Sequence, residues 1–201
     1  MSLFRKLFGS KSDKEKEEET TSQGGKYMPP VKLPIDESFM INFKDNGGKF
    51  LYCDTMNEVY DNMALIIEEN NWQDKSAYFY DQNLKQSFND LYLNTSGLSD
   101  ATYFVSTCEN LISDDGSILL SSNQLAEKKL SEFPTNIIIF ATTSQIVTNI
   151  GEGLREIKTK NANKIPTNIS TIKLFKPAAE NDFLTYGSPS KNLYLLLLED
   201  L

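Results

Sequence analysis

Two adjacent carboxylates stand beside a glycine and a serine in CENLISDDGSILLSSNQ, residues 108–124. Asp114 and Asp115 are residue types that perform general acid–base catalysis, and Ser117 adds a hydroxyl. These residues and Gly116 also separate two apolar segments, and Asp-Gly is a preferred pair at the turn of a β-hairpin. Neighbouring side chains of an extended chain point to opposite sides, so only one carboxylate can face a given pocket. The local pattern favours a hairpin and leaves a catalytic role for Asp114 or Asp115 open.

A hydroxyl cluster follows the apolar run NIIIFA, residues 136–141. Thr142, Thr143 and Ser144 stand where a strand is expected to pass into a helix. Their hydroxyls, together with the backbone N–H groups of a helix start, could hold an anionic ligand. The same three residues could instead serve only as a helix cap.

A second candidate anion site is the stretch YGSPSKN, residues 186–192, before the last apolar run. Its glycine, serines and proline are typical of a turn. The hydroxyls of Ser188 and Ser190, with backbone N–H groups and the ammonium group of Lys191, could bind a carboxylate or a phosphate. A plain turn explains this composition equally well.

The chain of 201 residues contains no histidine. This excludes Ser-His-Asp and Cys-His catalysis and histidine-based zinc sites, so proton transfer would need Asp, Glu, Lys, Tyr or Cys. The two cysteines cannot form a four-cysteine metal site and do not make a disulfide framework, which favours a reducing cytoplasm. Phosphate-loop and dinucleotide-binding glycine motifs are absent, which disfavours an ATPase or a dinucleotide dehydrogenase, and we expect no cofactor. No EF-hand spacing occurs and we expect no metal site, although carboxylates alone leave bound Mg²⁺ or Ca²⁺ open. The net charge of −8 argues against non-specific nucleic-acid binding.

Helical and strand patterns alternate along the chain, which predicts an α/β fold with a largely parallel sheet and flanking helices. The clearest helix begins at Thr55, which has capping-box spacing to Glu58. The run NIIIFAT is typical of a strand that is buried on both faces. The pattern predicts helices over 36–48, 55–71, 81–88 and 144–160, and strands over 49–53, 77–80, 101–107, 117–122, 136–142 and 191–200.

The N-terminal region differs in composition from the rest. Residues 9–26 contain no apolar residue, so we predict a disordered tail over residues 1–26 and an α/β domain over residues 27–201. Within the tail, MSLFRKLF at residues 1–8 has apolar residues on one side of a helical wheel. It could contact a membrane surface or a partner groove, or be an incidental apolar end.

The segment FVSTCENLISDDGSILLSSNQ, followed by FPTNIIIFATTSQIV, resembles the core of the LUD, or lactate-utilisation, domain family. Residues 114–117 and the apolar residues 118–120 stand where that family has an acidic residue, a Thr-Gly-Thr/Ser turn and a hydrophobic strand. Residues 188–192 loosely match its late Gly-Pro-Ser-Arg segment. The acidic positions of that late segment are Leu193 and Tyr194 here. The ferredoxin-like cysteines of the iron–sulfur members are absent, so the chain resembles the small, cluster-free component.

The resemblance, which covers roughly residues 36–201, implies a fold like that of the NagB/RpiA/CoA-transferase superfamily: a Rossmann-like sheet with a pocket at the carboxyl ends of its strands. It implies a part in oxidising L-lactate to pyruvate beside an iron–sulfur subunit and a flavin/iron–sulfur subunit. Asp114 or Asp115 would orient the ligand or act as acid or base. The ligand-binding residues would be Gly116, Ser117, Thr142, Thr143, Ser144, Ser188, Ser190 and Lys191. Two alternatives remain open: a group-transfer enzyme like the CoA-transferases or cyclo-ligases, and a non-catalytic interaction module tethered by residues 1–26.

Overall fold

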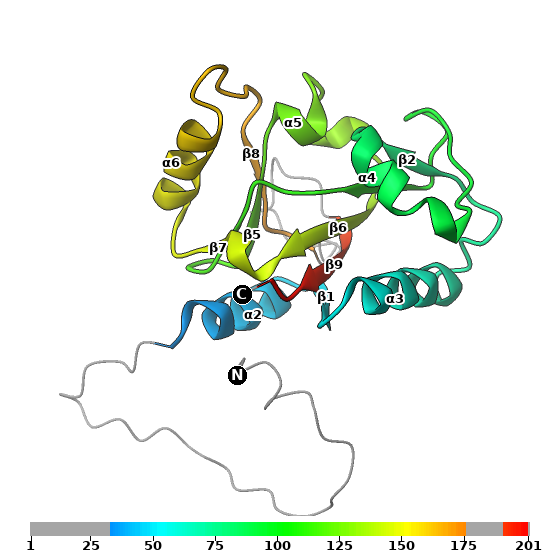
Figure 1. Ribbon diagram of the computed structural model, residues 1–201, viewed down its shortest axis with the longest axis horizontal. Coiled ribbons are helices and arrows are strands. Elements are labelled where there is room, and N and C mark those ends of the chain that lie inside the picture. Colours follow the sequence, from blue (N-terminus) through cyan, green and yellow to red (C-terminus); the bar gives the residue numbers. More distant parts are fainter. Residues whose placement is uncertain (1–32, 176–190, 201) are drawn as a thin grey trace, which may run out of the picture. The chain divides into compact units, whose positions relative to one another are not determined.

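The main sheet consists of five parallel strands (Figure 1). The computed structural model of the protein describes residues 33–175 and 191–200. The strands lie in the order β1-β9-β6-β3-β2. They comprise β1 (Lys49–Cys53), β2 (Ala77–Phe79), β3 (Tyr103–Ser106), β6 (Asn136–Thr142) and β9 (Asn192–Leu198). The predicted α/β fold is confirmed. The predicted tail over residues 1–26 and the start of the domain at residue 27 lie outside the described residues and stay predictions.

A second, smaller sheet has the order β7-β4-β5-β8. Its strands are β4 (Asn110–Ile112), β5 (Ser117–Leu120), β7 (Ile146–Val147) and β8 (Ser170–Ile172). The antiparallel pair β4–β5 is the hairpin that Asp-Gly predicts. Its first strand is β4 and not the end of the predicted strand 101–107, because the chain leaves the main sheet after Ser106 and pairs again from Asn110.

The helices are α2 (Ile35–Asp45), α3 (Met56–Glu69), α4 (Gln82–Ser87), α5 (Ser122–Leu125) and α6 (Ile150–Lys160). Short 3₁₀ turns lie at Asn89–Leu91, Leu130–Glu132 and Thr143–Gln145. The predicted cap of α3 is confirmed, since the Thr55 hydroxyl accepts a hydrogen bond from the backbone N–H of Glu58 at 3.3 Å. This cap satisfies one of the N–H groups that have no partner within the helix.

The predicted helix over 144–160 is wrong in its first turns. Residues 143–145 form a 3₁₀ turn and Ile146–Val147 pair with β4, so α6 begins only at Ile150. Asn149 sets this start, because its side-chain oxygen accepts the backbone N–H of Glu152 at 3.1 Å. The buried face of α6 is formed by Gly153 and Ile157, while Ile150 is exposed.

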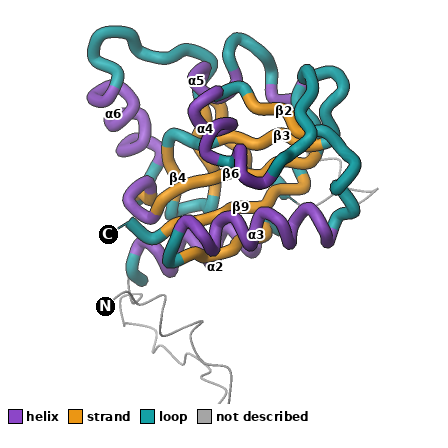
Figure 2. The backbone as a smooth tube through the Cα atoms, turned by 45° about the vertical axis from the view of Figure 1, so that its right-hand side comes forward, coloured by secondary structure: helices purple, strands orange, loops and turns teal. Residues whose placement is uncertain are grey.

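The main sheet is buried on both faces. One face of β6 and β9 packs in a core with residues of α2 and the second sheet. Its residues are Ile137, Ile139, Leu193, Leu195 and Leu197. The alternating residues Ile138, Tyr194 and Leu196 pack in the other core with residues of α3 and α4. Figure 2 shows α3 running beside β9. Burial on both sides explains why these two strands are almost continuously apolar. Within residues 33–175 and 191–200, no helix is long and apolar enough to cross a membrane.

Candidate functional site

A polar cluster lies at the carboxyl edge of the main sheet, where β6 and β9 end side by side. The Asp200 carboxylate accepts three hydrogen bonds there: from the Thr143 hydroxyl at 3.0 Å, from the Ser144 N–H at 2.9 Å and from the Ser144 hydroxyl at 2.7 Å. The Thr142 and Ser144 hydroxyls are 3.0 Å apart. We call Thr142, Thr143, Ser144 and Asp200 the strand-end cluster. It holds one carboxylate with donors from one loop.

The hydrogen bonds of the strand-end cluster favour the charged form of Asp200. Burial by itself would raise the pKa of the Asp200 carboxyl, but the Ser144 hydroxyl and N–H, with the Thr142 and Thr143 hydroxyls, lower it overall. Asp200 is nevertheless exposed to solvent. The loop therefore stabilises a carboxylate anion at a position that a free anion could also reach.

A second carboxylate, that of Glu199, lies beside the strand-end cluster. The Thr143 hydroxyl is 3.3 Å from Glu199 Oε1, and the Tyr52 hydroxyl at the end of β1 donates to Glu199 Oε2. The backbone N–H of Asp200 also donates to the Thr143 hydroxyl at 3.2 Å. Two carboxylates thus approach the same hydroxyl, and a further anion would have to replace one of them.

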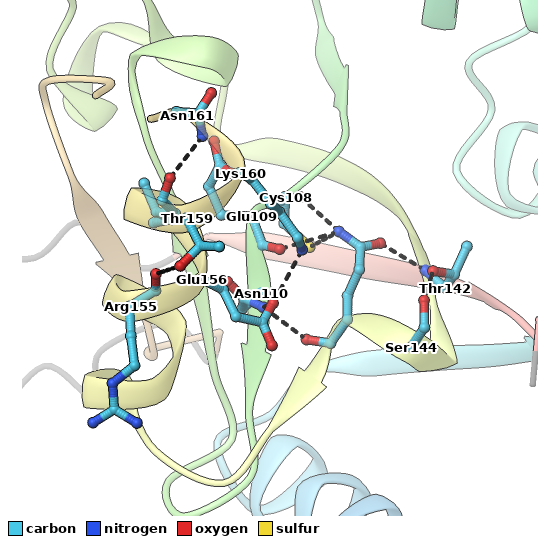
Figure 3. Close-up of polar contacts among 12 residues, drawn as sticks. Cys108, Glu109, Asn110, Thr142, Ser144, Arg155, Glu156, Thr159, Lys160 and Asn161 are labelled. Carbon is cyan, nitrogen blue, oxygen red and sulfur yellow. Dashed lines mark hydrogen bonds and ion pairs between the residues drawn. The ribbon is translucent and has the colours of Figure 1, made fainter. Parts of the chain in front are cut away.

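Gln145 joins the strand-end cluster to the residues that follow β3. Its side-chain oxygen accepts the N–H of Thr142 at 2.8 Å, and its Nε2 donates to the carbonyls of Cys108 at 2.7 Å and Glu109 at 3.3 Å. Figure 3 shows Glu109 between Thr142 on one side and Glu156 of α6 on the other. Because one amide bridges both loops, the ends of β3 and β6 keep a fixed spacing.

Glu109 is a candidate functional residue that the sequence did not single out. Its Oε1 accepts hydrogen bonds from the Ser121 hydroxyl at 2.6 Å and the Asn123 side chain at 2.8 Å. Among the described residues, no donor contacts its Oε2. The signal that could have found Glu109 is its place a few residues after a buried strand, since such residues gather at the carboxyl edge of a parallel sheet.

The neighbouring Cys108 and Asn110 have structural partners. Burial raises the pKa of the Cys108 thiol far above its usual range, so Cys108 is protonated and a poor nucleophile near neutral pH. Asn110 donates from Nδ2 to Glu156 Oε2 at 2.9 Å and to the Gln145 carbonyl at 3.4 Å. The hydrogen bond from Asn110 is the largest cause of a lowered pKa of Glu156; burial opposes it, and the contact with Lys160 adds to it. These contacts fix α6 against β4.

The turn between β4 and β5 holds four of the predicted site residues. They are Asp114, Asp115, Gly116 and Ser117, and we call them the hairpin tip. Asp115 Oδ1 accepts the N–H of Ser117 at 3.0 Å and its hydroxyl at 2.6 Å, and Asp115 Oδ2 lies 3.4 Å from Lys173 Nζ. Burial would raise the pKa of Asp115, but the Ser117 contacts and Lys173 lower it overall. Both oxygens of Asp115 therefore have partners, whereas Asp114 is exposed.

The hairpin tip packs on α2 and not on the strand-end cluster. Asn42 donates to the Ser113 carbonyl at 2.8 Å, and Asn46 donates to the Asp115 carbonyl at 2.7 Å. Gly116 has a φ of +67°, and a Cβ added there would lie 2.4 Å from backbone atoms of Asn42. This turn requires glycine both for its left-handed backbone and for its close approach to the helix.

Lys191 lies at the opposite edge of the main sheet from the strand-end cluster. It immediately precedes β9, whereas Asp200 follows this seven-residue strand, which spans about 23 Å at roughly 3.3 Å per residue. The Lys191 side chain is buried, and its ammonium donates to the carbonyls of Phe133 at 2.8 Å and Pro134 at 3.0 Å. Burial lowers the pKa of Lys191. Ser188 and Ser190 lie outside the described residues.

The predicted site residues thus occupy separate places. Thr142, Thr143 and Ser144 are together at the carboxyl edge, residues 114–117 are together at the hairpin tip, and Lys191 is at the amino edge. In the part of the chain that the structure describes, no three Asp, Glu or Cys side chains are grouped so that they could hold a metal ion.

Comparisons with known proteins agree with the fold. A family model described as the LUD domain matches residues 94–198, which is more than half of the chain. A solved structure of a DUF162 family protein from Deinococcus radiodurans aligns with a TM-score of 0.60 and 13% sequence identity, over 83% of this chain and 96% of that chain. At this identity the likeness concerns the fold. No curated protein matches the sequence.

Proposed function

This chain belongs to the LUD, or lactate-utilisation, domain family, and on this premise we propose that it binds a small carboxylate such as lactate or pyruvate at the strand-end cluster. One observation supports the proposal. The Thr143–Ser144 loop already holds the Asp200 carboxylate through two hydroxyls and a backbone N–H. Hydrogen-bond donors that are arranged around the Asp200 carboxylate could bind the carboxylate of a ligand in the same geometry.

Charge decides how such a ligand would enter. Glu199 and Asp200 are both within hydrogen-bonding distance of the Thr143 hydroxyl, so an added anion would meet two like charges. We therefore propose that the ligand replaces the Asp200 carboxylate. Asp200 is exposed and lies beyond Leu198, the last residue of β9, so its side chain can leave the loop without disturbing that strand.

The remaining functional assignments come from the family resemblance. We propose that an iron–sulfur subunit and a flavin/iron–sulfur subunit receive the two electrons released when lactate becomes pyruvate, and that the protein acts in the cytoplasm. Asp114 or Asp115 would serve as acid or base with Gly116 and Ser117 beside them, and Ser188, Ser190 and Lys191 would hold an anion. The separation of these residues from the strand-end cluster means that each group needs its own test.

Calorimetry and thermal shift with lactate, pyruvate and the matched amide lactamide test the proposal. We expect both carboxylates, and not lactamide, to stabilise the protein, by about 2.7 kcal/mol at a hundredfold excess over the dissociation constant. Because the Ser144 hydroxyl also donates to Asp200 in the free protein, its effect on the ligand is measured in the Asp200→Asn background. There Ser144→Ala should weaken binding by about tenfold or more, because it removes a hydrogen bond to a charged group worth about 1.5–3 kcal/mol. Asp200→Asn should strengthen binding, because it removes the competing charge. The control is Ser131→Ala, at an exposed serine on the 3₁₀ turn Leu130–Glu132.

The proposal fails if neither carboxylate binds the wild type or Asp200→Asn. It also fails if, in the Asp200→Asn background, Ser144→Ala binds as tightly as Ser131→Ala. If binding is unchanged in Ser144→Ala but lost in Lys191→Ala, the anion site lies at the amino edge of the sheet and the strand-end cluster is structural.

A second candidate is group transfer from a CoA thioester, and the geometry of Glu109 favours it. Ser121 and Asn123 fix one oxygen of Glu109, and no described donor occupies the other. Attack of this carboxylate on the thioester carbonyl would form a mixed anhydride and release the CoA thiolate. Exchange of labelled CoA into acetyl-CoA should then be abolished by Glu109→Gln. Asp115→Asn tests the hairpin tip in the same assay. If that variant abolishes exchange while leaving the thermal midpoint unchanged, Asp115 is catalytic.

A further inference from the structure

Exposed apolar side chains gather along α6 and along residues 161–169, which connect α6 to β8 and which we call the connecting segment. Ten large apolar side chains are exposed among the described residues, and four of them lie within residues 150–169. They are Ile150 and Leu154 on α6, and Ile165 and Ile169 on the connecting segment. Large apolar side chains that gather in one region, unlike those scattered singly, are typical of an interaction surface.

The strand β8 exposes the face that it turns towards α6. Thr171 pairs with Leu119 of β5, and Leu119 packs in the small core under α6. Side chains directly opposite each other on paired strands share a face, so Thr171 points to the same side of the second sheet as α6. Burial alternates over residues 169–174, with Ile169, Thr171 and Lys173 exposed. The helix therefore leaves the β8 end of this face uncovered, and Figure 1 shows α6 beside β8.

One flank of α6 points towards β7 and β4 and the other towards β5 and β8. Glu156 is hydrogen-bonded to a side chain of β4, and Glu152 to the backbone directly after β7. Residues two apart on a helix point about 200° apart, so Leu154 lies on the other flank, towards the β8 end of the sheet order. Ile150, one turn earlier, lies beside Leu154. Residues at this spacing form a ridge of the kind that packs against another helix.

The charges that accompany this ridge are positive. Lys158 lies one helical turn after Leu154 and therefore on the same flank of α6. Lys164 lies on the connecting segment, directly before Ile165. Within residues 33–175 and 191–200, neither lysine takes part in an ion pair. Two unpaired lysines thus lie beside the exposed apolar side chains. We call these lysines, with Ile150, Leu154, Ile165, Ile169 and Thr171, the α6–β8 surface.

The carboxylates around the α6–β8 surface do not cancel this charge. Asp115 is paired with Lys173 at 3.4 Å, and Glu127 accepts the hydroxyl of Thr167 on the connecting segment at 2.6 Å. The two glutamates of α6 lie on its other flank. Asp114 is exposed, but it lies at the hairpin tip, beyond the end of β8. The surface is therefore complementary to a partner that combines apolar and acidic side chains.

We propose that the α6–β8 surface is the docking site for an amphipathic helix of a partner protein, with Asp and Glu on its polar side. The apolar side of that helix packs on the ridge of α6 and on Ile169 and Thr171, and its carboxylates meet Lys158 and Lys164. Helices pack about 8–10 Å apart, so a helix beside α6 lies over the uncovered strand β8. Burial of an amphipathic helix on an apolar surface is a common mode of recognition. This proposal does not rest on lactate binding.

Two synthetic amphipathic peptides with a fluorescent label test the proposal on the full-length protein. Each is about 18 residues long, or about five helical turns, with leucine on one side. One carries glutamate at its polar positions and the other carries lysine. We expect the glutamate peptide to bind saturably, with an affinity that falls as salt is added, because salt screens the attraction between opposite charges. The lysine peptide should not bind.

Two variants and two matched controls locate the binding. Leu154→Gln removes an apolar contact and Lys158→Glu reverses a charge, and each should weaken binding of the glutamate peptide by about tenfold or more. The controls are Leu65→Gln, at an exposed leucine of α3, and Lys75→Glu, at an exposed lysine that follows α3. Both controls should leave binding unchanged. All four side chains are exposed, so thermal midpoints should stay close to that of the wild type.

The proposal is overturned if the glutamate peptide does not bind, if the lysine peptide binds equally well, or if the two variants bind as tightly as their controls. Sedimentation tests a second copy of the chain as the occupant. Self-association that Leu154→Gln abolishes would overturn the proposal in favour of that copy. Vesicles with anionic phosphatidylglycerol test a membrane. If they bind the wild type but not Lys158→Glu, and the glutamate peptide does not bind, the surface meets a membrane and the proposal is wrong.

Discussion

Replacing Gly116 by alanine should destabilise the fold severely, and the structure gives the reasons. The backbone at Gly116 has a φ of +67°, which costs an L-residue roughly 1–2 kcal/mol. The added Cβ would also lie 2.4 Å from Asn42 C and Phe43 N. These are backbone atoms of a packed helix, so no side-chain rotation relieves the overlap. The hairpin tip or α2 must then move, at the cost of overpacking, typically about 1–3 kcal/mol.

The two effects together predict a loss of about 3 kcal/mol in the free energy of unfolding. For a domain of this size, each 1 kcal/mol lowers the thermal midpoint by about 2–4 °C, so the expected decrease is about 10 °C. Urea denaturation and calorimetry measure both quantities. The matched control is Gly97→Ala, because a Cβ added at Gly97 meets no atom within 4 Å.

This reasoning is refuted if the free energies of unfolding of Gly116→Ala and Gly97→Ala differ by less than about 1 kcal/mol. Substitutions at the surface usually change this free energy by about ±0.5 kcal/mol. That result would mean that the hairpin tip does not pack on α2 as the structure describes. The hydrogen bonds from Asn42 and Asn46 to this turn would then be in question as well.

Two further predictions concern pH. Because its contacts hold the pKa of Asp115 below the unfolded value of about 3.9, they stabilise the fold above that pH, and this stabilisation is lost as the pH falls through the lower folded pKa. Asp115→Asn should be less stable than the wild type by less than about 1 kcal/mol near pH 6, since the pair with Lys173 is half-exposed, and urea melts should converge with those of the wild type in strong acid. Burial lowers the pKa of Lys191, so the folded state loses this proton first, and stability should rise with pH up to the unfolded value of about 10.4. Lys191→Met should lack this rise in denaturation at about pH 8 and pH 10, and an equal rise in both proteins would contradict the assignment.

The sequence identified the elements whose pattern comes from local burial. The apolar runs of β6 and β9 are continuous because both faces of those strands are covered, and Thr55 caps α3 through its own neighbours. The start of α6 could not be found this way. Ile146 has helical spacing to Ile150, but it pairs with Leu111 of β4, a partner from a distant part of the chain.

The candidate site shows the same division. Thr142, Thr143 and Ser144 were found because hydroxyls that follow a buried strand are visible in the sequence. Their partner Asp200 was not found, because it depends on the parallel register that brings Thr142 beside Leu198. The sequence grouped Lys191 with these hydroxyls, yet Lys191 precedes β9 and Thr142 is the last residue of β6. All strands of a parallel sheet run in the same direction, so the start of one strand and the end of another lie at opposite edges of the sheet. The predicted parallel sheet therefore already implied that Lys191 and Thr142 are far apart.

The hairpin tip and the strand-end cluster are distant but mechanically connected, which affects how any variant of Asp115 is interpreted. The hairpin tip closes β4 onto β5, β4 pairs with β7, and β7 begins directly after Gln145. Gln145 in turn holds the N–H of Thr142. Disturbing the turn can therefore displace the carboxylate-binding loop through the second sheet. Loss of ligand binding in an Asp115 variant indicates direct participation only if stability is unchanged, and loss in proportion to stability indicates that the turn acts by holding the second sheet in place.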